Sequence, residues 1–167
     1  MIEVHATAKH FHGLRRHRGR PFRSPDPLRP GAGVNLLLNI DVPDLAAAKT
    51  FYVAAFGMVV GRHLGDGVIE LLGAEVPIYL LQKDAGSRGA ANATRDYARH
   101  WTPLHLDVVV DDLDAALARA LAAGATREGG IRTTGWGRIV QLADPFGHRW
   151  CLLQFLGRGY DEIATSP

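Results

Sequence analysis

VPDLAAA, at residues 42–48, is the stretch that decides the fold, because it recurs 68 positions later as VDDLDAA at residues 110–116. Each copy follows an apolar, strand-like run. The aspartates Asp44 and Asp112 stand where a carboxylate can accept a hydrogen bond from a free N–H of a first helical turn. The repeat therefore predicts two helices that begin in the same way, each directly after a strand.

The segments around these aspartates complete two copies of one unit. Both helices are alanine-rich and end at a glycine, Gly57 or Gly124, which suits a left-handed cap. Alternating and apolar runs predict strands over residues 34–42, 58–64, 68–72 and 76–82, then over 104–110, 125–132, 137–143 and 149–155. Because one βαβββ module cannot cover its own sheet, the fold class is α+β with two paired modules.

The predicted organisation has five parts: a basic His/Arg/Pro-rich irregular leader (1–33), the first module (34–83), a linker (84–101), the second module (102–157) and a tail (158–167). Clustered arginines in the leader could attract nucleic acid. The leader lacks an aromatic ladder, a zinc pattern and a recognition helix, so a solvated extension is favoured. No apolar run approaches the ~18 residues that cross a bilayer. A single cysteine excludes an intrachain disulfide, which fits a cytoplasmic protein.

Three motifs resemble the vicinal oxygen chelate superfamily, also called the glyoxalase/bleomycin-resistance/dioxygenase fold. They are the Val-x-Asp-Leu helix entry in both halves, the dipeptides FY and FG at residues 51–52 and 56–57, and DPFGH at residues 144–148. Residues 152–162 resemble the end of a bacterial subgroup of uncharacterised glyoxalase-like proteins. The resemblance implies a curved, mixed eight-stranded sheet of two half-barrels, with helices on the convex side and a small-molecule pocket on the concave side. It does not imply one reaction, because the fold hosts several enzymes and non-catalytic binding proteins.

The resemblance also implies metal-ligand positions. The position seven residues before each helix-entry aspartate holds Leu37 in the first half, which cannot bind metal, and His105 in the second. The last-strand position of the second half holds Cys151, and the matching slot of the first half holds Tyr79 or Leu81. His105 and Cys151 are too few, since metal sites need about three protein ligands. The prediction is therefore no metal of the usual kind, with a divalent ion only if Tyr79 or a partner chain helps.

Both remaining positions allow a catalytic interpretation. His105 could act as a general acid or base, or it could be a pocket histidine that hydrogen-bonds a neighbour or ligand, which we favour. Cys151 could be a nucleophile if His105 lowered its pKa, but a lone cysteine in an apolar run is more often a small buried residue.

Other side chains are candidates for ligand binding. Alternation along the first strand places Leu37 and Asn39 on the face opposite the continuous apolar set, so Asn39 should point into the concavity. Trp136 could stack on a planar ligand or pack on the partner half, and Arg138 could hold a carboxylate. Trp101 is expected at the pocket mouth, and Trp150 in the core beneath the second helix.

The resulting hypothesis is a homodimeric, glyoxalase-like protein that binds a small organic molecule in the concave pocket without the usual metal centre. The alternative is a lyase- or isomerase-type enzyme. It would use His105 with an unorthodox metal site or in acid/base chemistry.

Overall fold

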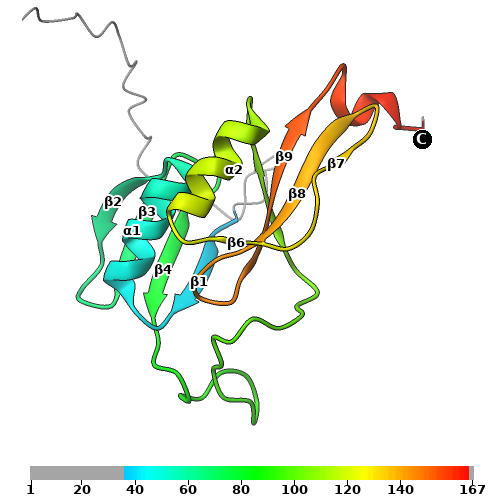
Figure 1. The fold of residues 1–167 in the computed structure, drawn as a ribbon. Helices are drawn as coiled ribbons and strands as arrows, with labels where there is room; N and C mark the ends of the chain where they lie inside the picture. Colours follow the sequence, from blue (N-terminus) through cyan, green and yellow to red (C-terminus); the bar gives the residue numbers. More distant parts are fainter. Residues whose placement is uncertain (1–35, 166–167) are drawn as a thin grey trace, which may run out of the picture. The chain divides into compact units, whose positions relative to one another are not determined.

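A computed structural model describes residues 36–165, so the predictions for the leader, including its contact with nucleic acid, lie outside the described residues. The described part confirms the α+β class with two βαβββ modules (Figure 1). The first module comprises β1 (Leu38–Val42), α1 (Leu45–Phe56), β2 (Val59–His63), β3 (Val68–Leu72) and β4 (Ile78–Gln82). The second comprises β5 (Leu106–Val109), α2 (Leu113–Ala122), β6 (Thr126–Arg127), β7 (Arg132–Thr133), β8 (Gly137–Ala143) and β9 (Arg149–Phe155). A 3-10 turn, η1 (Gly159–Glu162), follows.

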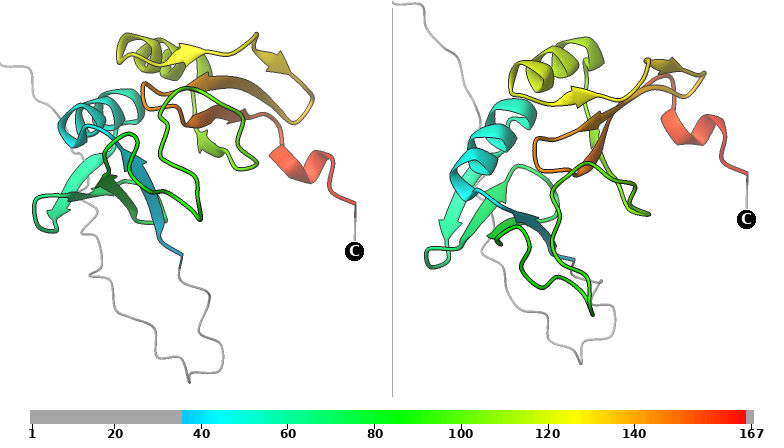
Figure 2. Two further views of the ribbon diagram at one scale, coloured as in Figure 1. Left: turned by 90° about the horizontal axis from the view of Figure 1, so that it is seen from below. Right: turned by 60° about the horizontal axis from the view of Figure 1, so that its bottom comes forward.

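The strands form two open sheets rather than one continuous sheet (Figure 2). Their orders are β1-β4-β3-β2 and β5-β9-β8-β6, with β7 also paired to β8. In each module the first strand runs parallel to the last, and the other pairs are antiparallel. The strand predicted over residues 125–132 exists only as β6 and β7, because Gly129-Gly130 interrupts it and Gly129 has a φ of 119°.

The helix boundaries follow the predicted capping chemistry. Asp44 Oδ1 accepts from the Ala47 N–H at 2.9 Å, and Asp112 Oδ1 accepts from the Ala115 N–H at 3.0 Å. Gly57 caps α1 in the left-handed region, with a φ of 70°. α2 ends one residue earlier than predicted, and Gly124 follows its cap with a φ of 109°. Both glycines therefore end their helices as the repeat indicated.

The helices cover one face of the sheets and pack against each other, which places the core between helices and strands. Trp150 of β9 is buried in this core, as predicted, and β9 packs against α2, but the Trp150 ring also contacts the first helix. Its ring centroid lies 5.5 Å from that of Tyr52 and 4.9 Å from that of Phe56, both in α1. Because the two helices lie side by side, a large side chain from β9 reaches the helix of the other module.

The face that the helices do not cover is called here the helix-free face. Its central residues in the first module are Asn39, Tyr79 and Glu70, which are neighbours across β1, β4 and β3. In the second module the matching row across β5, β9 and β8 is Asp107, Cys151 and Gln141. Residues that lie directly opposite in paired strands share a face, so each row presents its side chains together.

Candidate functional site

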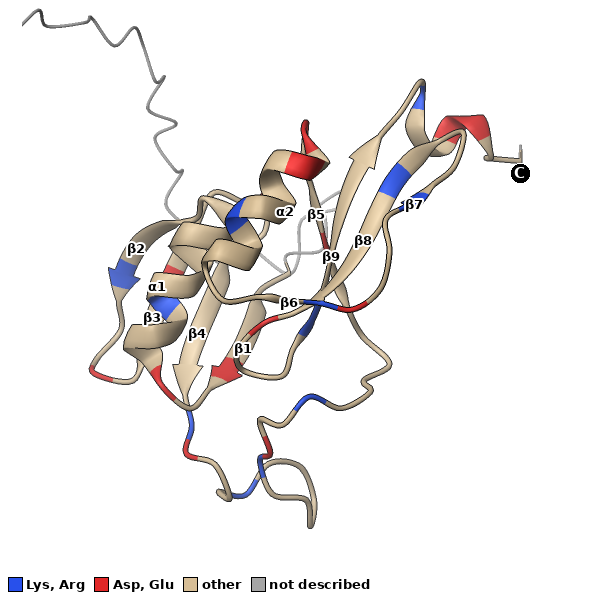
Figure 3. Ribbon diagram, viewed as in Figure 1, with Lys and Arg blue, Asp and Glu red and all other residues tan. Residues whose placement is uncertain are grey.

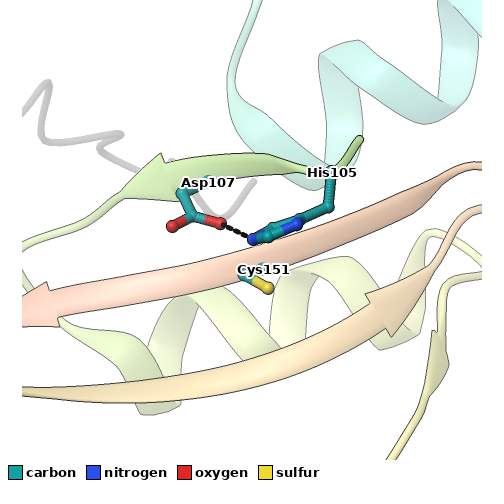
Figure 4. Close-up of side chains that lie close together, drawn as sticks. All are labelled: His105, Asp107 and Cys151. Carbon is teal, nitrogen blue, oxygen red and sulfur yellow. Dashed lines mark ion pairs between the residues drawn. The ribbon is translucent and has the colours of Figure 1, made fainter. Parts of the chain in front are cut away.

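The second module brings His105 and Cys151 together and adds Asp107. Asp107 lies opposite Cys151 in the β5–β9 pair, and His105 precedes Asp107 by two residues on the same face. His105 Nε2 lies 3.4 Å from Asp107 Oδ1. The three donor atoms all lie within 4.8 Å of one another (Figure 4). The cluster therefore contains three side chains that can bind a metal: Asp107 of β5, Cys151 of β9, and His105 directly before β5.

Sequence reasoning missed Asp107, although a signal for it was present. The alternation that placed Asn39 on the helix-free face applies equally to the matching strand, where it pairs Asp107 with His105. The distance from the helix-entry aspartate identified only one position of that strand, so its neighbour two residues later was overlooked.

The Cys151 side chain is nearly inaccessible to solvent. Burial raises the pKa of its thiol to about 11, and the charge and hydrogen bond of Asp107 add to this effect. The charges of Arg149 and Arg132 act in the opposite direction without reversing it. The thiol is therefore protonated at neutral pH in the absence of a bound cation, which argues against a nucleophilic role.

The matching row of the first module is a closed hydrogen-bond cluster. Arg62 donates to both carboxylate oxygens of Glu70, from Nε at 2.9 Å and from an Nη at 2.6 Å. The Tyr79 hydroxyl donates to Glu70 at 3.0 Å. The hydrogen bonds from Arg62 lower the pKa of Glu70 to about 2, although burial opposes the shift. Burial and then Glu70 raise the pKa of Tyr79.

This cluster leaves the first module without an available metal ligand at the positions that the resemblance implied. Leu37 precedes β1 and has an apolar side chain that is 41% exposed. Tyr79 is engaged by Glu70, and Glu70 is engaged by Arg62. A metal centre that drew ligands from both modules could therefore take none from these residues without breaking the ion pair.

The remaining candidates are dispersed. Asn39 is exposed on the helix-free face, whereas Trp101 lies in the linker and is 75% exposed. Arg138 lies in register with Gln154 and donates to Asp114 of α2 at 2.9 Å, which places it on the helix side. Figure 3 marks the basic residues of β8 and the acidic residues at the start of α2, between which this ion pair forms. Trp136 packs against Tyr160, with ring centroids 5.0 Å apart, so neither Trp136 nor Arg138 joins His105.

A second buried polar centre surrounds Asp144, in the turn between β8 and β9. Its carboxylate accepts hydrogen bonds from Tyr52 Oη at 2.5 Å and Trp150 Nε1 at 3.2 Å, and pairs with His148 Nδ1 at 2.9 Å. It also accepts from the backbone N–H groups of Phe146 and His148, each at 2.9 Å. Because Tyr52 belongs to α1, this aspartate links the two modules.

A hollow of about 350 Å³ lies away from these clusters, at the end of β5 and the start of α2. Its lining residues are Val109, Val110, Asp111, Asp112 and Arg119. No helix among residues 36–165 is both long and apolar enough to span a bilayer.

The two βαβββ modules have the fold of the vicinal oxygen chelate superfamily. Residues 37–153 match the family described as the glyoxalase-like domain, so the chain belongs to that family.

Relatives agree with this assignment. An uncharacterised protein of Mycobacterium tuberculosis is 38% identical over 133 residues, which cover 75% of this chain and 77% of that protein. A glyoxalase/bleomycin resistance protein/dioxygenase family enzyme from Burkholderia phytofirmans is 21% identical with a TM-score of 0.57, covering 72% of this chain and 97% of its own.

A third similar structure is a mutant of the fosfomycin resistance protein FosX from Listeria monocytogenes, complexed with Mn(II) and 1S,2S-dihydroxypropylphosphonic acid. It is 19% identical, has a TM-score of 0.54, and covers 72% of this chain and 88% of its own. At these identities the two structural likenesses show the fold alone.

Proposed function

We propose that this glyoxalase-like protein binds a small organic molecule on its helix-free face. It does so without the usual metal centre, in which the ligands come from both modules. The observation that carries the proposal is the state of the first module, where Leu37 is apolar and Tyr79 is held by Glu70 and Arg62. The sheet architecture is retained while these ligand positions are not. Exposed polar groups remain on both rows, Asn39 and Gln141, and such groups orient ligands among apolar neighbours.

Binding can be tested on the full chain with two probes. One is 1S,2S-dihydroxypropylphosphonic acid, and the other is S-lactoylglutathione, chosen because a lactoylglutathione lyase from Agrobacterium tumefaciens has a similar fold, with 21% identity and a TM-score of 0.53. We expect at least one probe to raise the unfolding temperature by several degrees at 100 times its Kd, where binding adds about 2.7 kcal/mol. Asn39→Leu should reduce the shift, because the polar group on the helix-free face is lost. Asn92→Ala, in the exposed linker, serves as the control and should not reduce it. Absence of any shift with both probes, or a shift that Asn39→Leu leaves intact, would contradict the proposal.

A lyase or isomerase activity is the second candidate, and the pairing of His105 with Asp107 favours it. The His105 side chain is 44% exposed, and its Nε2 lies beside a carboxylate that can stabilise an imidazolium. For formation of S-lactoylglutathione from methylglyoxal and glutathione, followed by its thioester absorbance, we expect His105→Ala to lower kcat by about 100-fold or more, the range of acid/base catalysis. His63→Ala, at an exposed histidine of β2, should leave kcat unchanged. Equal kcat in the wild type and His105→Ala would exclude this role.

A further inference from the structure

The cluster of His105, Asp107 and Cys151 has spacings that suit a bound ion better than a direct hydrogen bond. Charge-assisted hydrogen bonds between nitrogen and oxygen are about 2.7–2.9 Å long, whereas His105 Nε2 and Asp107 Oδ1 are 3.4 Å apart. Nitrogen and oxygen ligands of one tetrahedral zinc ion, each about 2.0–2.2 Å from it, are separated by about 3.4 Å. The observed separation therefore equals that of two ligands around one ion.

The chemistry of the donors selects the metal. An imidazole, a carboxylate and a thiol are the three side-chain types that bind zinc in proteins, and thiolate disfavours magnesium and calcium. A zinc ion displaces the thiol proton to solvent, because a coordinating thiol is deprotonated. The charges of one thiolate and one carboxylate then balance the dication.

The positions of the donors are also suitable, since Asp107 and Cys151 occupy directly opposed positions in paired strands. Strands hold ligands more precisely than loops do. The sulfur lies within 4.8 Å of both other donors, and binding of one ion would draw the three donor atoms closer together.

We propose that His105, Asp107 and Cys151 bind one zinc ion within the second module alone. This site differs from a two-module centre because it needs no residue of the first module, where Glu70 and Tyr79 are committed to Arg62. Three protein ligands leave a fourth position, which an oxygen of a small organic molecule can occupy. The proposal goes beyond organic-ligand binding and is tested without it.

Cobalt(II) is the probe, because cobalt–thiolate coordination produces an intense near-ultraviolet charge-transfer band. The full chain contains one cysteine, so this band reports on Cys151 alone. Cobalt that is bound by the four histidines of residues 1–33 does not contribute to it. The chain is first treated with a chelator, then titrated with cobalt and finally with zinc. We expect the band to saturate at one cobalt per chain and to disappear as zinc replaces cobalt.

Matched variants separate this site from unspecific binding. Cys151→Ser should abolish the band. His105→Ala and Asp107→Asn should each weaken zinc binding by more than tenfold. Mutation of a residue that only contacts a metal ligand already lowers metal affinity by about tenfold or more, and these variants remove a ligand itself. A chain with alanine at His5, His10, His12 and His17 should retain the band in full. No thiolate band in the wild type, or a band that neither His105→Ala nor Asp107→Asn weakens, would overturn the proposal. Circular dichroism of each variant confirms that the chain is folded.

Discussion

Asp144→Ala is expected to lower the free energy of unfolding by about 3–5 kcal/mol, the range for losing one partner of a buried charged cluster. The Asp144 side chain is fully buried, and alanine would leave the Tyr52 hydroxyl and the Trp150 indole N–H without their acceptor. Each buried donor that loses its partner costs about 1–3 kcal/mol. Urea denaturation followed by tryptophan fluorescence measures the change.

Conservative variants apportion this loss. Tyr52→Phe keeps the ring in the core and removes only the hydroxyl, so about 2 kcal/mol is expected for a hydrogen bond to a charged group. A double-mutant cycle with Asp144→Asn should show a coupling energy near 1 kcal/mol or above, since the two groups are in contact. Asp66→Ala, at an exposed turn position, is the control and should change stability by less than about 0.5 kcal/mol. Additive Tyr52 and Asp144 effects would show that this inter-module contact contributes little.

The same cluster predicts part of the acid sensitivity of the protein. Burial alone would raise the pKa of Asp144, but the hydrogen bond and charge of His148 and the Tyr52 hydroxyl outweigh it, so the pKa is lowered. A carboxyl with a lowered folded-state pKa contributes stability above its unfolded pKa of about 3.9, and this contribution is lost as pH falls through the folded value. The unfolding free energy of Asp144→Asn should therefore decline less than that of the wild type below pH 4.

Local signals in the sequence were sufficient for the elements of the fold. Asp44 and Asp112 marked helix starts, and Gly57 marked a helix end, because capping depends on residues within one turn. The repeat placed the strands around them. The sequence did not reveal that Gly129-Gly130 divides a predicted strand, since periodicity alone continued through it.

Site residues could be predicted only where their place along a single strand was enough to identify them. His105 and Cys151 were placed from the ligand positions that the resemblance to the superfamily implied, and the structure brings them together. The partners of Glu70 were not predictable, because its contacts with Arg62 and Tyr79 depend on the register of three strands. The contact of Trp150 with α1 likewise depends on how the two modules pack, which no local pattern encodes.

The ion pair of Glu70 gives the second large expected effect: Arg62→Ala should lower the free energy of unfolding at pH 7 by about 2–3 kcal/mol. The Glu70 side chain is only 7% exposed, and the variant would leave its charge buried with the Tyr79 hydroxyl and one backbone N–H as donors. The Arg62 side chain itself is 58% exposed, so the loss comes from the carboxylate rather than from the guanidinium. Arg158→Ala is the matched control. It removes an exposed pair with Glu162 and should leave the free energy of unfolding nearly unchanged.

The dependence of this loss on pH distinguishes an electrostatic origin from lost packing. In the wild type the pKa of Glu70 is about 2, so its contribution is complete above the unfolded value near 4.5 and is lost as pH falls toward 2. Without Arg62, burial should raise that pKa, so the variant should protonate Glu70 at higher pH. The difference in unfolding free energy between wild type and Arg62→Ala should thus narrow between pH 5 and about pH 2, where Glu70 is neutral in the variant and about half protonated in the wild type. A difference that stays constant over this range would mean that Arg62 stabilises the first module through the contacts of its aliphatic stem.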